Sequence, residues 1–111
     1  MLRILPALAL CSGAVAKVVR YSWDITWVHA NPDGLQARPV IGVNGKFPNP
    51  IIKADLGDTI IVKINNKLGN ETTGIHFHGM SQRGTNHMDG PSGVTQCPSK
   101  ALIFELLIIV F

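Results

Sequence analysis

The sequence predicts an all-β protein with the short strands of a β-sandwich or β-barrel, and three observations lead to this prediction. Residues 18–28 alternate between apolar and polar side chains, and residues 59–65 are rich in β-branched side chains. Clusters of Gly, Pro, Asn and Asp separate these and other short apolar runs. No segment of useful length between the two ends of the chain repeats with the period of a helix.

The first predicted strand covers residues 18–28, VVRYSWDITWV. Successive side chains of a strand point to opposite faces, so this alternation predicts one buried and one exposed face. The predicted buried face carries Val19, Tyr21, Trp23, Ile25 and Trp27. Residues 29–34, HANPDG, are dense in turn formers and are expected to end the strand.

Residues 39–43 are a second short apolar run, and Asn44-Gly45 after them suits a tight turn because both residues tolerate positive φ. The segment 47–50, FPNP, contains two prolines that cannot donate ladder hydrogen bonds, so it is expected at an edge or in a loop. Residues 51–54, IIKA, are expected to form another short strand.

Residues 59–65, TIIVKIN, are the clearest strand prediction in the chain. Asp55 and Asp58 flank the turn before it and are expected to be solvated loop residues. After this strand the sequence predicts a polar loop that contains the N-glycosylation sequon Asn70-Glu71-Thr72. A short strand is expected at residues 74–79, followed by a long loop rich in Gly, Ser, Pro and Asn.

Length and composition exclude several classes of protein. A chain of 111 residues allows one compact domain, and it has no apolar run long enough for a polytopic membrane protein. Its ten Lys and Arg, against seven Asp and Glu, give a net charge of +3 but are scattered, so nucleic-acid binding has little support. Hydrolytic G-x-S-x-G and phosphate-binding glycine motifs are missing from the sequence.

Residues 1–16, MLRILPALALCSGAVA, have the layout of a secretory signal peptide, and the alternative is a buried first strand or helix. Arg3 precedes the apolar stretch, and Ala14-Val15-Ala16 supplies a small-residue cleavage pattern. Cleavage after Ala16 would remove Cys11 and leave Cys97 unpaired. An unpaired cysteine in a secreted protein suggests a partner outside the chain.

Ten of the eleven residues in the segment 101–111, ALIFELLIIVF, are apolar. Eleven residues are too few to cross a bilayer, which needs about 20. Two interpretations remain open: a terminal core strand in which Glu105 would be costly, or a tail foreign to the domain before it.

The chemistry concentrates in the segment Ile75-His76-Phe77-His78-Gly79. Residues i and i+2 of a strand point to the same face, so His76 and His78 are expected side by side. Two imidazoles can hold one metal or place one nitrogen on each of two metals, and imidazole suits Cu, Zn, Fe and Ni. A pair of histidines without any metal is the alternative. His29 and His87 could add ligands, but both are expected in turn-rich loops.

Six motifs in order resemble the first half of the N-terminal plastocyanin-like (cupredoxin) domain of the multicopper oxidases, and the closest patterns are those of fungal iron-transport ferroxidases and laccases. The matching pieces are Asn31-Pro32-Asp33-Gly34-Leu35, Arg38-Pro39-Val40-Ile41-Gly42-Val43-Asn44-Gly45, Leu56-Gly57-Asp58, Ile75-His76-Phe77-His78-Gly79-Met80, Met88-Asp89-Gly90 and Val94-Thr95-Gln96-Cys97-Pro98. The resemblance therefore implies a partial cupredoxin-like Greek-key β-sandwich at residues 17–100, an apolar signal segment before it, and a tail at 101–111 that does not match the family.

The resemblance also implies roles for individual residues. His76 matches the ligand of the type 2 copper and His78 a ligand of one type 3 copper, in the trinuclear cluster that reduces O2 to water. Asp89 matches an acidic residue near the cluster that supports protonation of oxygen, although on residue grounds alone it is a turn residue. Cys97 matches a cysteine that forms a disulfide with a distant part of the full-length chain.

The sequence departs from the family after Cys97, because no second H-x-H follows and no His or Met remains for a type 1 copper site. We therefore expect a fragment of a secreted or cell-surface copper oxidoreductase that is inactive alone. In the full-length family its partners are O2 and an electron donor, ferrous iron or a phenol. The alternative is a non-catalytic copper-binding or strand-pairing β protein, since the closely spaced Cys, His and Met of a single-domain electron-transfer cupredoxin are missing.

Overall fold

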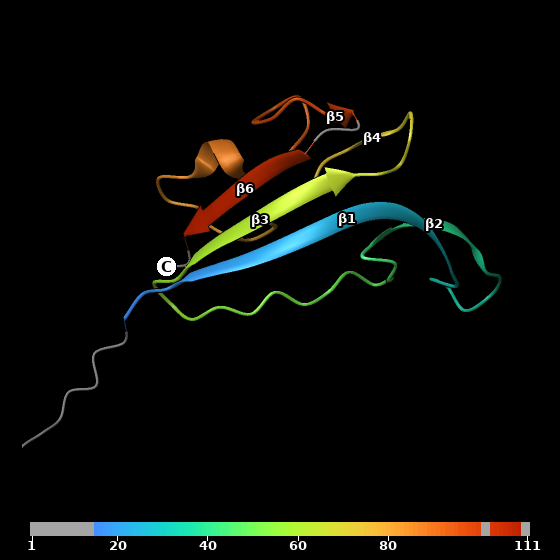
Figure 1. Cartoon of the computed structure of the whole chain (residues 1–111), viewed down its shortest axis with the longest axis horizontal. Helices are drawn as coiled ribbons and strands as arrows, with labels where there is room; N and C mark the ends of the chain where they lie inside the picture. Colours follow the sequence, from blue (N-terminus) through green and yellow to red (C-terminus); the bar gives the residue numbers. More distant parts are fainter. Residues whose placement is uncertain (1–14, 101–102, 110–111) are drawn as a thin grey trace, which may run out of the picture.

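The computed structural model describes residues 15–100 and 103–109, and Figure 1 shows a chain built almost wholly of strands and loops. The elements in chain order are β1 (Val18–Ala30), β2 (Arg38–Val43), β3 (Thr59–Asn66), β4 (Thr72–Thr73), the 3-10 helix η1 (Asn86–Met88), β5 (Ser99–Lys100) and β6 (Ile103–Ile109). The all-β prediction is confirmed. Most of residues 1–16, the expected signal peptide, lie outside the described residues.

One four-stranded sheet organises the molecule, in the order β2-β1-β3-β6, and β4 and β5 form a second, two-stranded sheet. β1 runs parallel to β3 from Val18 to Ile25, and then pairs antiparallel with β2 from Ile25 to Ala30. β6 runs antiparallel to β3 on its other side, as Figure 1 shows. Within the segment 101–111, residues 103–109 form the strand β6 at the edge of this sheet, and this pairing is compatible with either interpretation of the segment.

The core lies on one face of this sheet. The buried apolar side chains are Trp23, Ile25, Val43, Ile60, Val62, Ile64 and Leu68. Alternation places the second, fourth and sixth residues of β3 on this face, while Lys63 between them is exposed. The loop between β2 and β3 and the histidine segment cover the core with partly buried side chains, which include Ile52, Ala54, Ile75 and Phe77.

The alternation predicted for β1 holds only to Ile25. Trp23 is buried, but Trp27 is 50% exposed, so the expectation that both lie on the buried face is wrong. The reason is the change of partner at Ile25, where β1 leaves β3 and continues beside β2. Trp27 then lies opposite Ile41, which is also exposed.

The expected tight turn after β2 is confirmed. Asn44 has a φ of 51° and Gly45 a φ of 72°, and Val43 and Lys46 exchange backbone hydrogen bonds across the two residues. The Asn44 side chain also binds β1, because its Oδ1 accepts from the backbone N of Asp24 at 2.8 Å. The segment 47–50 after the turn is a loop, as predicted, and its Phe47–Pro48 bond is cis.

Two of the expected short strands do not form ladders. Residues 51–54 form no ladder. Instead, the Tyr21 hydroxyl donates to the carbonyl O of Lys53 and accepts from its N–H, both at 3.0 Å. The expected strand at 74–79 forms no ladder either: Gly74 and Ile75 lie against the loop at 90–92, and residues 78–79 form a turn. The Tyr21 side chain thus provides hydrogen bonds to the backbone of the first segment, and a glycine-rich loop lies against the second.

Asp58 is buried, with 2% of its surface exposed, so the expectation of a solvated loop residue is wrong for it, whereas Asp55 is exposed. Asp58 Oδ1 accepts from the backbone N of Lys17 at 3.0 Å, and Oδ2 accepts from the backbone N of Asp55 at 2.9 Å. These hydrogen bonds, that from Lys17 first, hold the pKa of Asp58 below its usual value. Asp58 thereby ties the start of β1 to the start of β3.

Candidate metal site

The two histidines of the H-x-H motif lie side by side, although no ladder strand carries them. Their ring centroids are 5.7 Å apart and the ring planes are inclined by 53°. Burial alternates along the segment, with Ile75 and Phe77 packed against the core and both histidines exposed. The apolar residues at alternate positions therefore hold the two imidazoles on the outer face.

Asp89 orients the first of the two imidazoles. His76 Nδ1 lies 3.0 Å from the backbone O of Asp89 and 3.2 Å from its Oδ1. A backbone carbonyl only accepts hydrogen bonds, so Nδ1 must carry the proton. In the neutral imidazole with this tautomer, the lone pair is on Nε2, which is the form that binds a metal ion when the other nitrogen is held by an oxygen.

The loop that brings Asp89 to His76 depends on a glycine. Gly90 is buried with a φ of 92°, and a Cβ there would overlap the carbonyl oxygen of Ile75. Only glycine allows both this backbone conformation and this close approach. The Gly90 N–H donates to Thr95 Oγ1 at 3.2 Å, which anchors the loop from the other side.

Gln82 is a member of this site that sequence reasoning missed. It is 2% exposed, and its Nε2 donates to Asp89 Oδ1 at 3.2 Å. A glutamine in a polar, glycine-rich loop gives no local signal of burial, and its partner lies seven residues further along the chain. His76, Asp89 and Gln82 therefore form one connected polar chain.

The other residues predicted for a site are not part of this hydrogen-bonded group of His76, Asp89 and Gln82. Within residues 15–98, whose side chains the structure describes, no group of three or more His, Cys, Asp and Glu is arranged to hold a metal ion. His29 lies on β1 rather than in the expected loop, and His87 lies on η1. Cys97 is a free, exposed thiol, and Asn70 is exposed in the turn between β3 and β4.

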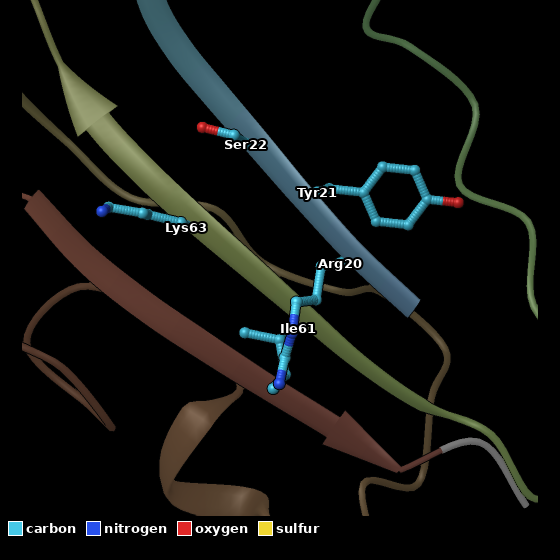
Figure 2. Close-up of a pocket in the computed structure, with 5 residues that line it drawn as sticks. All are labelled: Arg20, Tyr21, Ser22, Ile61 and Lys63. Carbon is cyan, nitrogen blue, oxygen red and sulfur yellow. The ribbon is translucent and has the colours of Figure 1, made fainter. Parts of the chain in front are cut away.

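A separate hollow of about 420 Å³ lies over β1 and β3, lined by Arg20, Tyr21, Ser22, Ile61 and Lys63. Figure 2 shows the Tyr21 ring pointing away from the side on which Ser22 and Lys63 lie. Ile61 and Lys63 alternate along β3 with buried core residues, so this hollow is on the opposite face of the sheet from the core. It contains neither histidine of the motif and is distinct from the candidate metal site.

The fold defines a cupredoxin-like segment that carries two paired imidazoles, and comparison with known proteins identifies its family. The family model for multicopper oxidases matches residues 24–101, so the chain belongs to the multicopper oxidase family. The expected resemblance is thus confirmed. Among the described residues, no helix is long and apolar enough to span a membrane.

Individual proteins of this family are similar in sequence to most of the chain. The iron transport multicopper oxidase fetC of Epichloe festucae is 60% identical over 84 residues, which are 76% of this chain and 14% of that protein. L-ascorbate oxidase of Nicotiana tabacum is 44% identical over 96 residues, covering 84% of this chain and 16% of the relative. The chain therefore spans only a small part of the length of these relatives.

Solved structures give the same fold. Fet3p, a multicopper oxidase that functions in iron import, superimposes with a TM-score of 0.77 and 38% identity, covering 84% of this chain and 18% of its own. A laccase from Botrytis aclada has a TM-score of 0.72 and 34% identity, covering 86% of this chain and 18% of its own. The partial cupredoxin-like sandwich predicted from the sequence is confirmed.

Proposed function

We propose that this chain is the part of a secreted or cell-surface multicopper oxidase that supplies two histidines to a trinuclear copper cluster. His76 would bind the type 2 copper and His78 one type 3 copper. The observation that supports this most directly is the hydrogen bond from His76 Nδ1 to Asp89, which leaves Nε2 free for a metal ion. The residues present fit two ligand positions of such a site.

The copper ions of such a cluster would supply electron transfer to O2, with ferrous iron or a phenol as the electron donor. The chain's own residues hold the histidine segment in place and orient the imidazole of His76. Ile75 and Phe77 anchor the segment in the core, and Asp89 fixes the proton on His76 Nδ1. The Asp89 carboxylate also stands beside the imidazole, where it could pass a proton toward oxygen. The names of the relatives favour ferrous iron as the reductant.

The same proposal assigns the other parts of the chain. Residues 1–16 would be a signal peptide, residues 17–100 an incomplete plastocyanin-like domain, and residues 101–111 a tail outside the family pattern, although 103–109 pair with β3. The exposed Cys97 would form a disulfide with a part of the protein outside this chain. Asn70 is exposed, as an N-glycosylated residue must be.

Two imidazoles are fewer than the three or more protein ligands that a metal site normally uses. We therefore expect the chain by itself to bind Cu²⁺ weakly and to show no oxidase turnover with ferrous iron or a phenol. Oxygen consumption above that of free Cu²⁺ by the isolated chain would contradict this part of the proposal.

The test is a Cu²⁺ titration of the chain and of the variants His76→Ala and His78→Ala, followed by electron paramagnetic resonance. Each variant is expected to lower the Cu²⁺ affinity by at least about tenfold. The matched control is His29→Ala, which removes an exposed histidine from β1 and should leave the affinity unchanged. If the chain binds no Cu²⁺ at micromolar concentration but associates with itself, the alternative of a strand-pairing β protein replaces the proposal.

A further inference from the structure

Gln82 combines two unfavourable features at one residue. Its backbone φ is 40°, in the left-handed region that residues other than glycine rarely adopt. Among the residues whose side chains the structure describes, its Oε1 is the buried side-chain oxygen or nitrogen that has no hydrogen-bond partner. Buried polar atoms are nearly always paired, so this exception calls for a reason.

The reason lies in the orientation of the amide. Asp89 Oδ1 is an acceptor, so the amide must present its NH2 group to the carboxylate, and Oε1 must then point the other way. The reversed amide would place two oxygens about as close as the present 3.2 Å contact. The orphaned Oε1 is therefore the direct consequence of holding Asp89 in place.

A hydrogen-bonded turn holds the backbone of Gln82 in its position. The backbone N of Thr85 donates to the carbonyl O of Gln82 at 2.9 Å, and Thr85 Oγ1 contacts the same oxygen at 3.4 Å. Thr85 is itself 2% exposed. This turn stabilises the left-handed backbone conformation of Gln82, whose buried side chain reaches Asp89.

We propose that Gln82 is a positioning residue. It fixes the Asp89 carboxylate, whose Oδ1 lies 3.2 Å from His76 Nδ1 and holds the proton on that nitrogen together with the Asp89 backbone O. The inference rests on the proposed function, because its consequence is the presentation of His76 Nε2 to copper. Gln82 does not touch the metal position itself; it acts through Asp89.

The test measures the tautomer of His76 by long-range ¹H–¹⁵N NMR, at a pH where the imidazoles are neutral, in the full 111-residue chain without metal. The unmodified chain should show the proton on Nδ1. Gln82→Leu, which removes the amide, should shift His76 toward the Nε2-protonated form and weaken Cu²⁺ binding about tenfold. Gln82→Gly should do the same without the backbone strain, so a folding defect of the leucine variant does not decide the outcome.

Two controls separate positioning from a general structural role. Gln96→Leu removes another amide from the same loop, one that contacts Met88 Sδ at 3.9 Å instead of Asp89, and should change neither readout. In an Asp89→Ala background, Gln82→Leu should have no further effect on the tautomer or on Cu²⁺ affinity. An additional loss in that background would show that Gln82 does not act through Asp89.

The inference is overturned if folded Gln82 variants keep both the His76 tautomer and the Cu²⁺ affinity of the unmodified chain. Its failure is distinguishable from failure of the proposed function. If the unmodified chain binds no Cu²⁺ through His76 and His78, the proposed function fails, whereas the tautomer measurement still decides whether Gln82 controls His76.

Discussion

Two buried polar side chains, Asp58 and Gln82, are equally inaccessible, with 2% exposure each, yet they are satisfied very differently. Both oxygens of Asp58 accept backbone hydrogen bonds, from Lys17 and Asp55. Gln82 uses its amide nitrogen on Asp89 and leaves its oxygen without a partner. A buried polar side chain whose atoms are all hydrogen-bonded is typical of a residue that stabilises the fold. A buried side chain with an unpaired atom indicates that another contact sets its geometry, which for Gln82 is the contact with Asp89.

The surroundings of the two residues differ in the same way. Asp58 stands at the start of β3, beside the buried apolar cluster of the sheet. Gln82 stands in a loop whose buried side chains are polar and which turns at several glycines with positive φ. We therefore expect the sheet to provide most of the stability and the loop to set the geometry of the candidate metal site.

The largest expected effect is on the sheet. Ile64→Ala removes a side chain with 0% exposure and should lower the free energy of unfolding by about 2–5 kcal/mol, because it leaves a cavity among packed neighbours. Urea denaturation followed by the fluorescence of the buried Trp23 measures this. The control Val94→Ala, at a residue 81% exposed, should change it by less than about 0.5 kcal/mol. Equal effects would refute the division between sheet and loop.

Gly90→Ala should damage the metal site most. The new Cβ would overlap the carbonyl oxygen of Ile75, so the loop and the histidine segment must separate. We expect Cu²⁺ affinity to fall by about tenfold or more, measured by titration of the folded variant. Gly84→Ala is the matched control, because Gly84 also has positive φ but open space around its Cβ position. A similar loss in both variants would point to backbone strain instead of the close approach.

The satisfied carboxylate predicts a pH dependence of stability. Because hydrogen bonds lower the pKa of folded Asp58 below its usual 3.8, its contribution is present above that pH and is lost as the pH falls toward the lowered value. Asp58→Asn should therefore be less stable than the unmodified chain near pH 7, and the difference should shrink in acid. Denaturation at several pH values measures it. A difference that stayed constant down to pH 2 would contradict this account.

The smallest expected effect concerns maturation. If the signal peptide ends at Ala16, the backbone N of Lys17 becomes a charged α-amino group 3.0 Å from Asp58 Oδ1. A chain beginning at Lys17 should then have a midpoint of thermal unfolding a few degrees above that of the same chain with an acetylated amino group. The difference should vanish in an Asp58→Asn background; if it persists there, the new amino group acts elsewhere.

Local pattern predicted the strands whose surroundings are regular. The β-branched run gave β3 to within one residue, and Asn44-Gly45 gave the turn after β2. Trp27 was misplaced because the alternation of one strand cannot show where that strand changes its partner. Residues 51–54 and 74–79 are predicted as strands from their short apolar runs, but strand pairing depends on neighbours distant in sequence.

The candidate site was predictable only in part. The H-x-H spacing placed His76 and His78 together, and the family resemblance pointed to Asp89. Gln82 could not be found from sequence, because its importance comes from burial and from one contact across a loop. The burial of Asp58 was missed for the same reason, since its partner Lys17 lies 41 residues away.

The proposed role of His76 and His78 as copper ligands is tested most directly by counting the imidazoles bound to Cu²⁺. Pulsed electron paramagnetic resonance of the chain with less than one equivalent of Cu²⁺ should detect imidazole nitrogen from these two residues. The signal should weaken in His76→Ala and in His78→Ala but persist in His29→Ala. A nitrogen signal that is unchanged when both His76 and His78 are replaced would contradict the claim.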